Sequence, residues 1–175
     1  MSPTAPDILV LAANLAPELE TEEVEAIEAE AEIEVAAAPD IQANGAELGL
    51  FSAVNADRAQ HGLPPLEWAP QLLDIARQRA QAQVDQPSLD HYDTSGQLAF
   101  VVLFQESGIR YRRAGENLAR IGGSDATRVQ RAESALMESP THRANILEGT
   151  YQGLAVGAGR DSRGNSTFAQ IFINP

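Results

Sequence analysis

Two apolar segments near the C-terminal end constrain the fold of this chain most strongly. Residues 153–159 (GLAVGAG) and 166–173 (STFAQIFI) combine small, β-branched and aromatic residues, and a polar DSRGN lies between them. Apolar runs around a short segment containing Gly and Asn are typical of a β-hairpin. The chain is therefore expected to end in two antiparallel strands, against which the preceding elements pack.

Helical patterns dominate the part of the chain before this hairpin. Over residues 47–60, Leu50, Phe51 and Val54 form one apolar stripe, and Gly62 ends the helix. Three more helices are expected over residues 70–85, 97–107 and 125–138, with start or stop signals at Pro70, Gly108, Ser124 or Asp125, and Pro140. Helices followed by a terminal hairpin predict an α/β fold with a mainly antiparallel sheet covered by helices.

The acidic charge of the chain is concentrated in its first quarter. The net charge is −13, yet residues 1–45 contain eleven acidic residues and no Lys or Arg, which leaves residues 46–175 nearly neutral. Within residues 18–38 the glutamates repel one another and have no Lys partners, as in a solvated, largely disordered linker. Binding of calcium or of a basic surface is the alternative role. The predicted organisation is an acidic N-terminal tail over 1–45 and a compact domain over 46–175.

Composition excludes several kinds of site and partner. The chain has no cysteine, so disulfides and thiolate metal sites are excluded. The densest basic group is Arg110, Arg112 and Arg113, which is too small for a nucleic-acid-binding face. No apolar run reaches the roughly 18–20 residues of a transmembrane helix. Residues 8–16 (ILVLAANLA) follow an acid rather than a basic segment, so we interpret them as part of the tail and not as a signal peptide.

Several segments, in this order and at this spacing, resemble one known family. They are VNADRAQHGLPPLEW (54–68), LLDIARQRA (72–80), His91 in a polar loop, GIRY (108–111), GENLA (115–119), SPTHRANIL (139–147), GLAVGAG (153–159) and FAQIF (168–172). Together they resemble the bacterial branch of the CAP superfamily, the SCP-like relatives of cysteine-rich secretory proteins, antigen 5 and pathogenesis-related proteins. The resemblance covers roughly residues 50–173. It implies an α/β/α sandwich and an extracellular or cell-envelope location.

The resemblance also implies a cavity lined by two histidines and two glutamates. By position, His91 and His142 match the histidines and Glu116 matches one glutamate. Animal and plant members have the second glutamate where this chain has Ser139. Its neighbour Glu138 is turned by about 100° along a helix. The expected cavity is therefore formed by His91, Glu116 and His142.

Four further residues are expected to support this cavity or the scaffold around it: Asn117, Ser139, Glu138 and Arg143. Asn117 follows Glu116 in the GEN motif, and its amide is suited to satisfying buried backbone groups. Asn55, Arg58, Arg143 and Asn145 also match family positions, and we interpret them as hydrogen-bonding residues that hold the fold.

The residues of the expected cavity suggest two kinds of reactive site, a metal site and a nucleophilic triad. Neutral imidazoles bind Zn²⁺ and similar divalent cations, so His91 and His142 are candidate metal ligands, although no short motif such as HExxH is present. Ser139, His142 and Glu116 imitate a nucleophilic triad, but a G-x-S-x-G elbow is missing. No residue is therefore assigned as catalytic.

The expected function is binding rather than turnover. The ligand is expected to be a lipid or cell-wall or matrix material, held by a monomeric domain, and a pure interaction module is the related possibility. The alternative is a divalent-metal-dependent hydrolase in which His91, Glu116 and His142 hold the metal and activate water.

Overall fold

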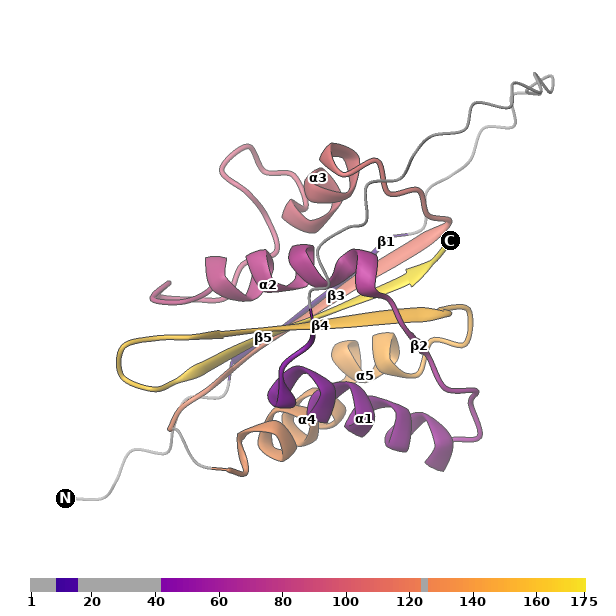
Figure 1. Ribbon diagram of the computed structural model, residues 1–175, viewed down its shortest axis with the longest axis horizontal. Helices are drawn as coiled ribbons and strands as arrows, with labels where there is room; N and C mark the ends of the chain where they lie inside the picture. Colours follow the sequence, from indigo (N-terminus) through magenta and orange to yellow (C-terminus); the bar gives the residue numbers. More distant parts are fainter. Residues whose placement is uncertain (1–8, 16–41, 124–125) are drawn as a thin grey trace.

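The computed structural model describes residues 9–15, 42–123 and 126–175, and shows a central sheet between two layers of helices (Figure 1). The elements are β1 (Leu9–Leu15), α1 (Gly45–Gln60), β2 (Glu67–Trp68), a 3₁₀ turn (Pro70–Leu72), α2 (Leu73–Ala82), α3 (Ala99–Glu106), β3 (Arg113–Ile121), α4 (Arg128–Glu138), α5 (Pro140–Ile146), β4 (Gly153–Arg160) and β5 (Ser166–Asn174). The five strands lie in the order β1-β3-β5-β4-β2. The predicted α/β/α sandwich is confirmed.

The C-terminal hairpin is the centre of the sheet. Strands β4 and β5 pair antiparallel from Gly153↔Ile173 to Arg160↔Ser166, as their sequences predict. On its other edge β5 pairs antiparallel with β3, so that Glu116 lies opposite Ile171. Among the strands of the described residues, β2 alone runs parallel to its neighbour, β4. The sheet is therefore mainly antiparallel, in agreement with the prediction.

Each face of the sheet has its own apolar core. In Figure 1, α2 and α3 cover one face, and α1, α4 and α5 cover the other. Successive side chains of a strand point to opposite faces. Phe168 and Phe172 of β5 accordingly pack with Leu50 of α1 and with α4, whereas Ile171 packs with Ile75 of α2 and with α3. Two neighbouring polar residues on a strand of this sheet therefore enter different helical layers, one on each side of the sheet.

The helices agree with their predicted positions, with shifted ends. Helix α1 begins at a capping box, in which the Asn44 side chain accepts from the amides of Ala46 and Glu47, and Glu47 accepts from the amide of Asn44. Helix α2 ends at Ala82, earlier than predicted, and α4 begins at Arg128. The caps expected for α4, Ser124 and Asp125, lie outside the described residues.

Helix α5 and the strands β1, β2 and β3 were not predicted from the sequence. Pro140, predicted only to stop a helix, is also the first residue of α5, a position in which proline needs no amide hydrogen. Residues 9–15, interpreted as part of the tail, form β1 and pair antiparallel with β3 at the edge of the sheet. The linker expected over residues 18–38 lies outside the described residues, and the division of the chain at residue 45 stays a prediction.

Gly157 on β4 allows α2 to lie against the sheet. A Cβ added at Gly157 would overlap the backbone of Ala76 and Arg77, which cannot rotate away as a side chain can. We expect Gly157→Ala to lower the free energy of unfolding by about 2–3 kcal/mol, measured by urea denaturation. Gly45→Ala is the control, because nothing lies within 4 Å of its added Cβ. Equal denaturation midpoints for the two variants would contradict the close packing of α2 on β4.

Candidate functional site

Glu116 is held between the sheet and α2 by two partners. Its side chain is fully buried on β3. Arg79 donates from Nε to Oε1 at 2.7 Å and from Nη2 to Oε2 at 3.1 Å, and His91 Nδ1 lies 2.5 Å from Oε2. Since a carboxylate oxygen accepts, Nδ1 is the nitrogen that carries the proton. Arg79, His91 and Glu116 form the "Glu116 cluster".

Helix α2 positions both His91 and its loop. Arg79 Nη2 also donates to the carbonyl of Asp90 at 2.7 Å. One turn later, the Gln83 side chain accepts from the amide of Asp90 at 2.9 Å and donates to its carbonyl at 3.1 Å. The carbonyl of His91 accepts from the amide of Ala99 at 2.9 Å, where α3 begins. Hydrogen bonds therefore fix the backbone on both sides of His91, and this positions its ring beside Glu116.

Arg79 is the residue of this cluster that sequence reasoning missed. Only 4% of its surface is exposed. It follows Ala76 by three positions, on the apolar stripe of α2, and a charged residue at such a position needs a buried partner. That placement was the available signal, but the sequence does not say which carboxylate the arginine meets.

Asn117, the next residue of β3, points to the opposite face of the sheet. Its Nδ2 donates to the carbonyl of His142 at 3.2 Å and to Gln170 Oε1 at 2.9 Å, and Asn145 Nδ2 donates to its Oδ1 at 2.9 Å. All these groups are buried, so the amides fix α5 against β3. These contacts are those expected of a scaffold residue, and the same role for Asn145 is confirmed.

The other fold-holding assignments can be followed in the contacts of α1. Asn55 pairs with both backbone groups of Leu66, and Arg58 donates to the carbonyls of Pro64, Ile146 and Glu148. Both side chains therefore tie α1 to the loops at its end, and their predicted structural role is confirmed.

His142 lies on α5, on the same face as Asn117. Its Nδ1 is 2.6 Å from Ser139 Oγ, at the junction between α4 and α5. The structure thus brings His91 to Glu116 and His142 to Ser139. Because adjacent residues of β3 face opposite ways, the sheet stands between the Glu116 side chain and the helix that carries His142. The cavity common to His91, Glu116 and His142 stays a prediction.

The fit of a metal ion to these residues is partial. His91 donates Nδ1–H to a carboxylate, as metal-ligating histidines do, and Nε2 is buried with no hydrogen-bond partner among the described residues. However, both oxygens of Glu116 already accept hydrogen bonds, and the charge of Arg79 lies beside them. Across residues 9–15, 42–123 and 126–175, no three His, Asp or Glu side chains gather closely enough to hold an ion. The site as it stands therefore does not fit a metal held by all three predicted residues.

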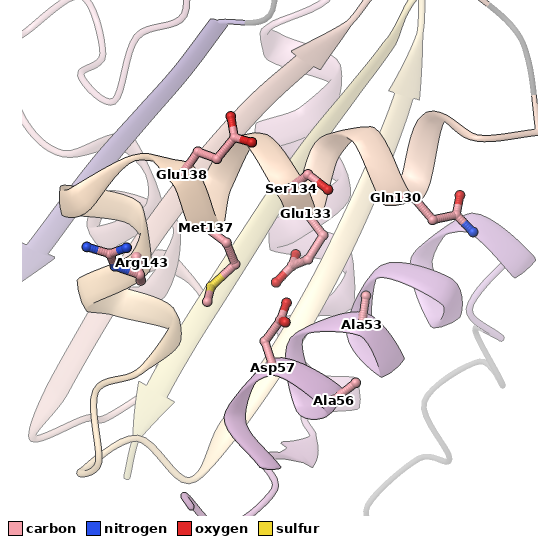
Figure 2. A pocket seen from close by; sticks show the side chains of 9 residues that line it. All are labelled: Ala53, Ala56, Asp57, Gln130, Glu133, Ser134, Met137, Glu138 and Arg143. Carbon is pink, nitrogen blue, oxygen red and sulfur yellow. The ribbon is translucent and has the colours of Figure 1, made fainter. Parts of the chain in front are cut away.

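Glu138 and Arg143 line a pocket of about 490 Å³ between α1, α4 and α5, on the face opposite the Glu116 cluster (Figure 2). Alanine and methionine side chains form part of its wall. The complete lining is Ala53, Ala56, Asp57, Gln130, Glu133, Ser134, Met137, Glu138 and Arg143. Neither Glu138 nor Arg143 is thus placed beside Glu116, and sequence reasoning did not identify the other pocket residues.

Two carboxyl groups face one another in this pocket, those of Glu133 on α4 and Asp57 on α1 (Figure 2). Burial first, and the charge of Asp57 second, raise the pKa of Glu133 from 4.5 to about 8. Gln170 Nε2 donates to Glu133 Oε2 at 3.0 Å, while its Oε1 accepts from Asn117. A chain of amide hydrogen bonds therefore connects the GEN motif on β3 with the acid pair of the pocket.

Comparison with known proteins agrees with this architecture. The model of the cysteine-rich secretory protein family (CAP) matches residues 51–172. The uncharacterised protein YkwD of Bacillus subtilis is 32% identical over 111 residues, which are 63% of this chain and 41% of that protein. The chain thus spans about two fifths of the length of this relative.

Solved structures show the same fold. An extracellular protein with an SCP domain from Bacillus anthracis superimposes with a TM-score of 0.62 and 27% identity, over 75% of this chain and 41% of that one. A cysteine-rich secretory protein from Staphylococcus aureus gives a TM-score of 0.57 and 20% identity, over 78% and 41% of the two chains. An outer surface protein of Borrelia burgdorferi gives 0.59 and 16%, over 71% and 89%. With the matched family model and this fold, the chain belongs to the CAP, or cysteine-rich secretory protein, family.

Proposed function

We propose that this CAP domain is a ligand-binding module of the cell envelope or the extracellular space, and that its ligand is a lipid or cell-wall material. The observation that carries the proposal is the pocket between α1 and α4. Its volume of about 490 Å³ lies in the range of small-molecule sites. Apolar wall residues such as Ala53 and Met137 suit an aliphatic part of a ligand, and Asp57 and Glu133 offer polar groups at fixed positions.

The state of Glu116 supports binding over turnover. A general base has to accept a proton from water or substrate. The carboxylate of Glu116 instead accepts from Arg79 and from His91 and lies fully buried. In this arrangement it is a structural anion that joins α2, the His91 loop and β3. For this reason we propose binding first and keep the metal-dependent hydrolase as the alternative.

An extracellular or envelope location is part of the same proposal. One supporting observation is the relative from Bacillus anthracis, which is described as an extracellular protein and is 27% identical. No helix in the described part of the chain is long and apolar enough to cross a bilayer. The monomeric state and the class of ligand are likewise proposals, and each can be tested on the purified chain.

The test compares lipid binding by the wild type, whose pocket is open, with binding by a variant whose pocket is filled by a larger side chain. We expect native mass spectrometry to detect bound lipid on the full-length chain, or binding from a panel of lipids and peptidoglycan fragments. Ala56→Trp, which fills the pocket, should weaken binding at least about tenfold, equivalent to roughly 1.4 kcal/mol. Ala59→Trp lies on the same helix outside the pocket lining and should bind as the wild type does. Equal binding by both variants, or no binding by the wild type, contradicts the proposal.

The same samples distinguish the hydrolase. If Zn²⁺ is the cofactor, saturating zinc should raise the melting temperature, and His91→Ala combined with His142→Ala should abolish the shift. No shift with zinc would remove the alternative and leave the binding proposal unaffected.

A further inference from the structure

The outermost strand of the sheet lies beside the strand that carries the GEN motif. Strand β1 pairs antiparallel with β3 over seven residues, from Leu9↔Arg120 to Leu15↔Ala114. In this register Ala13 lies opposite Glu116 and Ala12 opposite Asn117. The opposite edge of β3 is paired with β5. The edge of β3 that would otherwise expose unpaired backbone groups is therefore covered by the N-terminal segment of the same chain.

The residues around this edge are suited to receive a backbone. Asn145 Nδ2 on α5 donates to the carbonyl of Ala13 at 3.2 Å. At Gly115 an added Cβ would come within 3.1 Å of that carbonyl oxygen and would overlap the hydroxyl of Tyr151. The missing side chain thus leaves space for the incoming strand. The Ala13 side chain packs against the core that contains Phe104 and Ile171.

Strand β1 is connected to the rest of the domain by a long segment. Residues 16–44 separate β1 from α1, a connection of 29 residues. Covalent geometry lets such a segment span up to about 100 Å, far more than the connection of one strand requires. It contains ten acidic residues and no Lys or Arg, whereas β1 itself, LVLAANL, has no charged residue. The chain thus presents an uncharged apolar strand at the end of an acidic connection.

We propose that the edge of β3 between Ala114 and Arg120 is a peptide-docking site, which takes an extended, uncharged, apolar segment of a partner protein by antiparallel strand addition. In this structure Leu9–Leu15 occupy it in cis. Backbone hydrogen bonds supply much of the affinity in strand addition, and the side chains of the added strand supply selectivity. The sequence of β1 therefore indicates the chemistry that the edge accepts. Because β1 belongs to the same chain, it competes with a partner's segment for this edge intramolecularly.

The test uses the full-length chain with a protease recognition sequence introduced between residues 24 and 32. A fluorescent peptide with the sequence of residues 8–16 is titrated before and after cleavage, and its anisotropy is measured. After cleavage, the fragment that contains β1 is no longer covalently attached, so it can dissociate and be replaced by the peptide. We expect the peptide to bind the cleaved protein at least about tenfold more tightly than the uncut chain.

The control peptide carries Ala12→Pro and Ala13→Pro. Successive amide groups of a strand point in opposite directions, so one of these prolines removes an amide that faces β3. This peptide should not bind either form. Equal binding of both peptides, equal affinity for cut and uncut protein, or no binding at all would overturn the docking site.

Two further outcomes have defined meanings. If cleavage and removal of the fragment unfold the domain, as judged by circular dichroism, β1 is an integral strand and the proposal fails. If the uncut chain forms dimers that cleavage dissociates, the occupant is the same strand of a second copy, and the assignment to a partner protein is overturned. A folded, monomeric cleaved protein that binds only the wild-type peptide is the expected result.

Discussion

Replacing Arg79 with methionine is expected to lower the free energy of unfolding by about 3–5 kcal/mol, because it leaves the carboxylate of Glu116 buried without its cation. Both oxygens of Glu116 accept from Arg79, and the carboxylate is fully buried. His91 alone would remain as a donor. The lost Arg79 hydrogen bond to Asp90 would also leave the start of the His91 loop dependent on Gln83. Urea denaturation followed by circular dichroism measures the effect.

Two further variants separate the buried charge from general effects of the substitution. Arg79→Met combined with Glu116→Gln should recover most of the loss, since no unpaired charge is then buried. Arg113 pairs with Glu148 at 2.6 Å, with both side chains partly exposed, so Arg113→Met should cost at most about 1 kcal/mol. If Arg79→Met lowers the free energy of unfolding by no more than Arg113→Met does, the contacts between Arg79 and Glu116 do not stabilise the fold as a buried ion pair should.

Glu133→Gln is expected to flatten the pH dependence of stability between about pH 4.5 and 8. The pKa of Glu133 is raised from 4.5 to about 8 in the folded protein, chiefly by burial and then by Asp57. Within that window the folded chain binds a proton that the unfolded chain has released. The stability contribution is therefore complete below pH 4.5 and is lost as the pH rises through 8, by up to about 4–5 kcal/mol.

Glutamine preserves the contacts of the protonated acid. Its amide oxygen can accept from Gln170, as Glu133 Oε2 does, and its amide group can donate toward Asp57. The variant should thus be more stable than the wild type at pH 8 and similar to it at pH 4.5. Thermal denaturation across this range provides the measurement. Glu138→Gln, at an exposed position on the same helix, should retain the slope of the wild type.

If the wild type and Glu133→Gln show the same slope, the pKa of Glu133 is not raised in the folded protein. The pocket would then present two charged carboxylates to a ligand. Asp57 faces Glu133, and its charge is, after burial, the next cause of the raised pKa of Glu133. Asp57→Asn should therefore also lower the midpoint of the transition.

The sequence by itself determined the terminal hairpin, the positions of four helices, the α/β/α class and the family. The hairpin and the helices depend on signals that act over a few residues: apolar stripes, Pro and Gly at helix ends, and the turn between β4 and β5. The class and the family follow from eight short segments in a fixed order along the chain. It also identified Glu116 and His91, which the fold brings to within 2.5 Å of each other. The location, the ligand and the metal stay predictions.

Only the tertiary structure decided what surrounds these residues. Strand β3 (RAGENLARI) contains Gly, Asn and charged residues that disfavour strands, and it is a strand because β1 and β5 pair with both of its edges. The same pairing directs Glu116 to Arg79 and Asn117 to the carbonyl of His142, on opposite faces. Contacts between residues 25 to 37 positions apart depend on register and packing, which no local pattern of residues encodes.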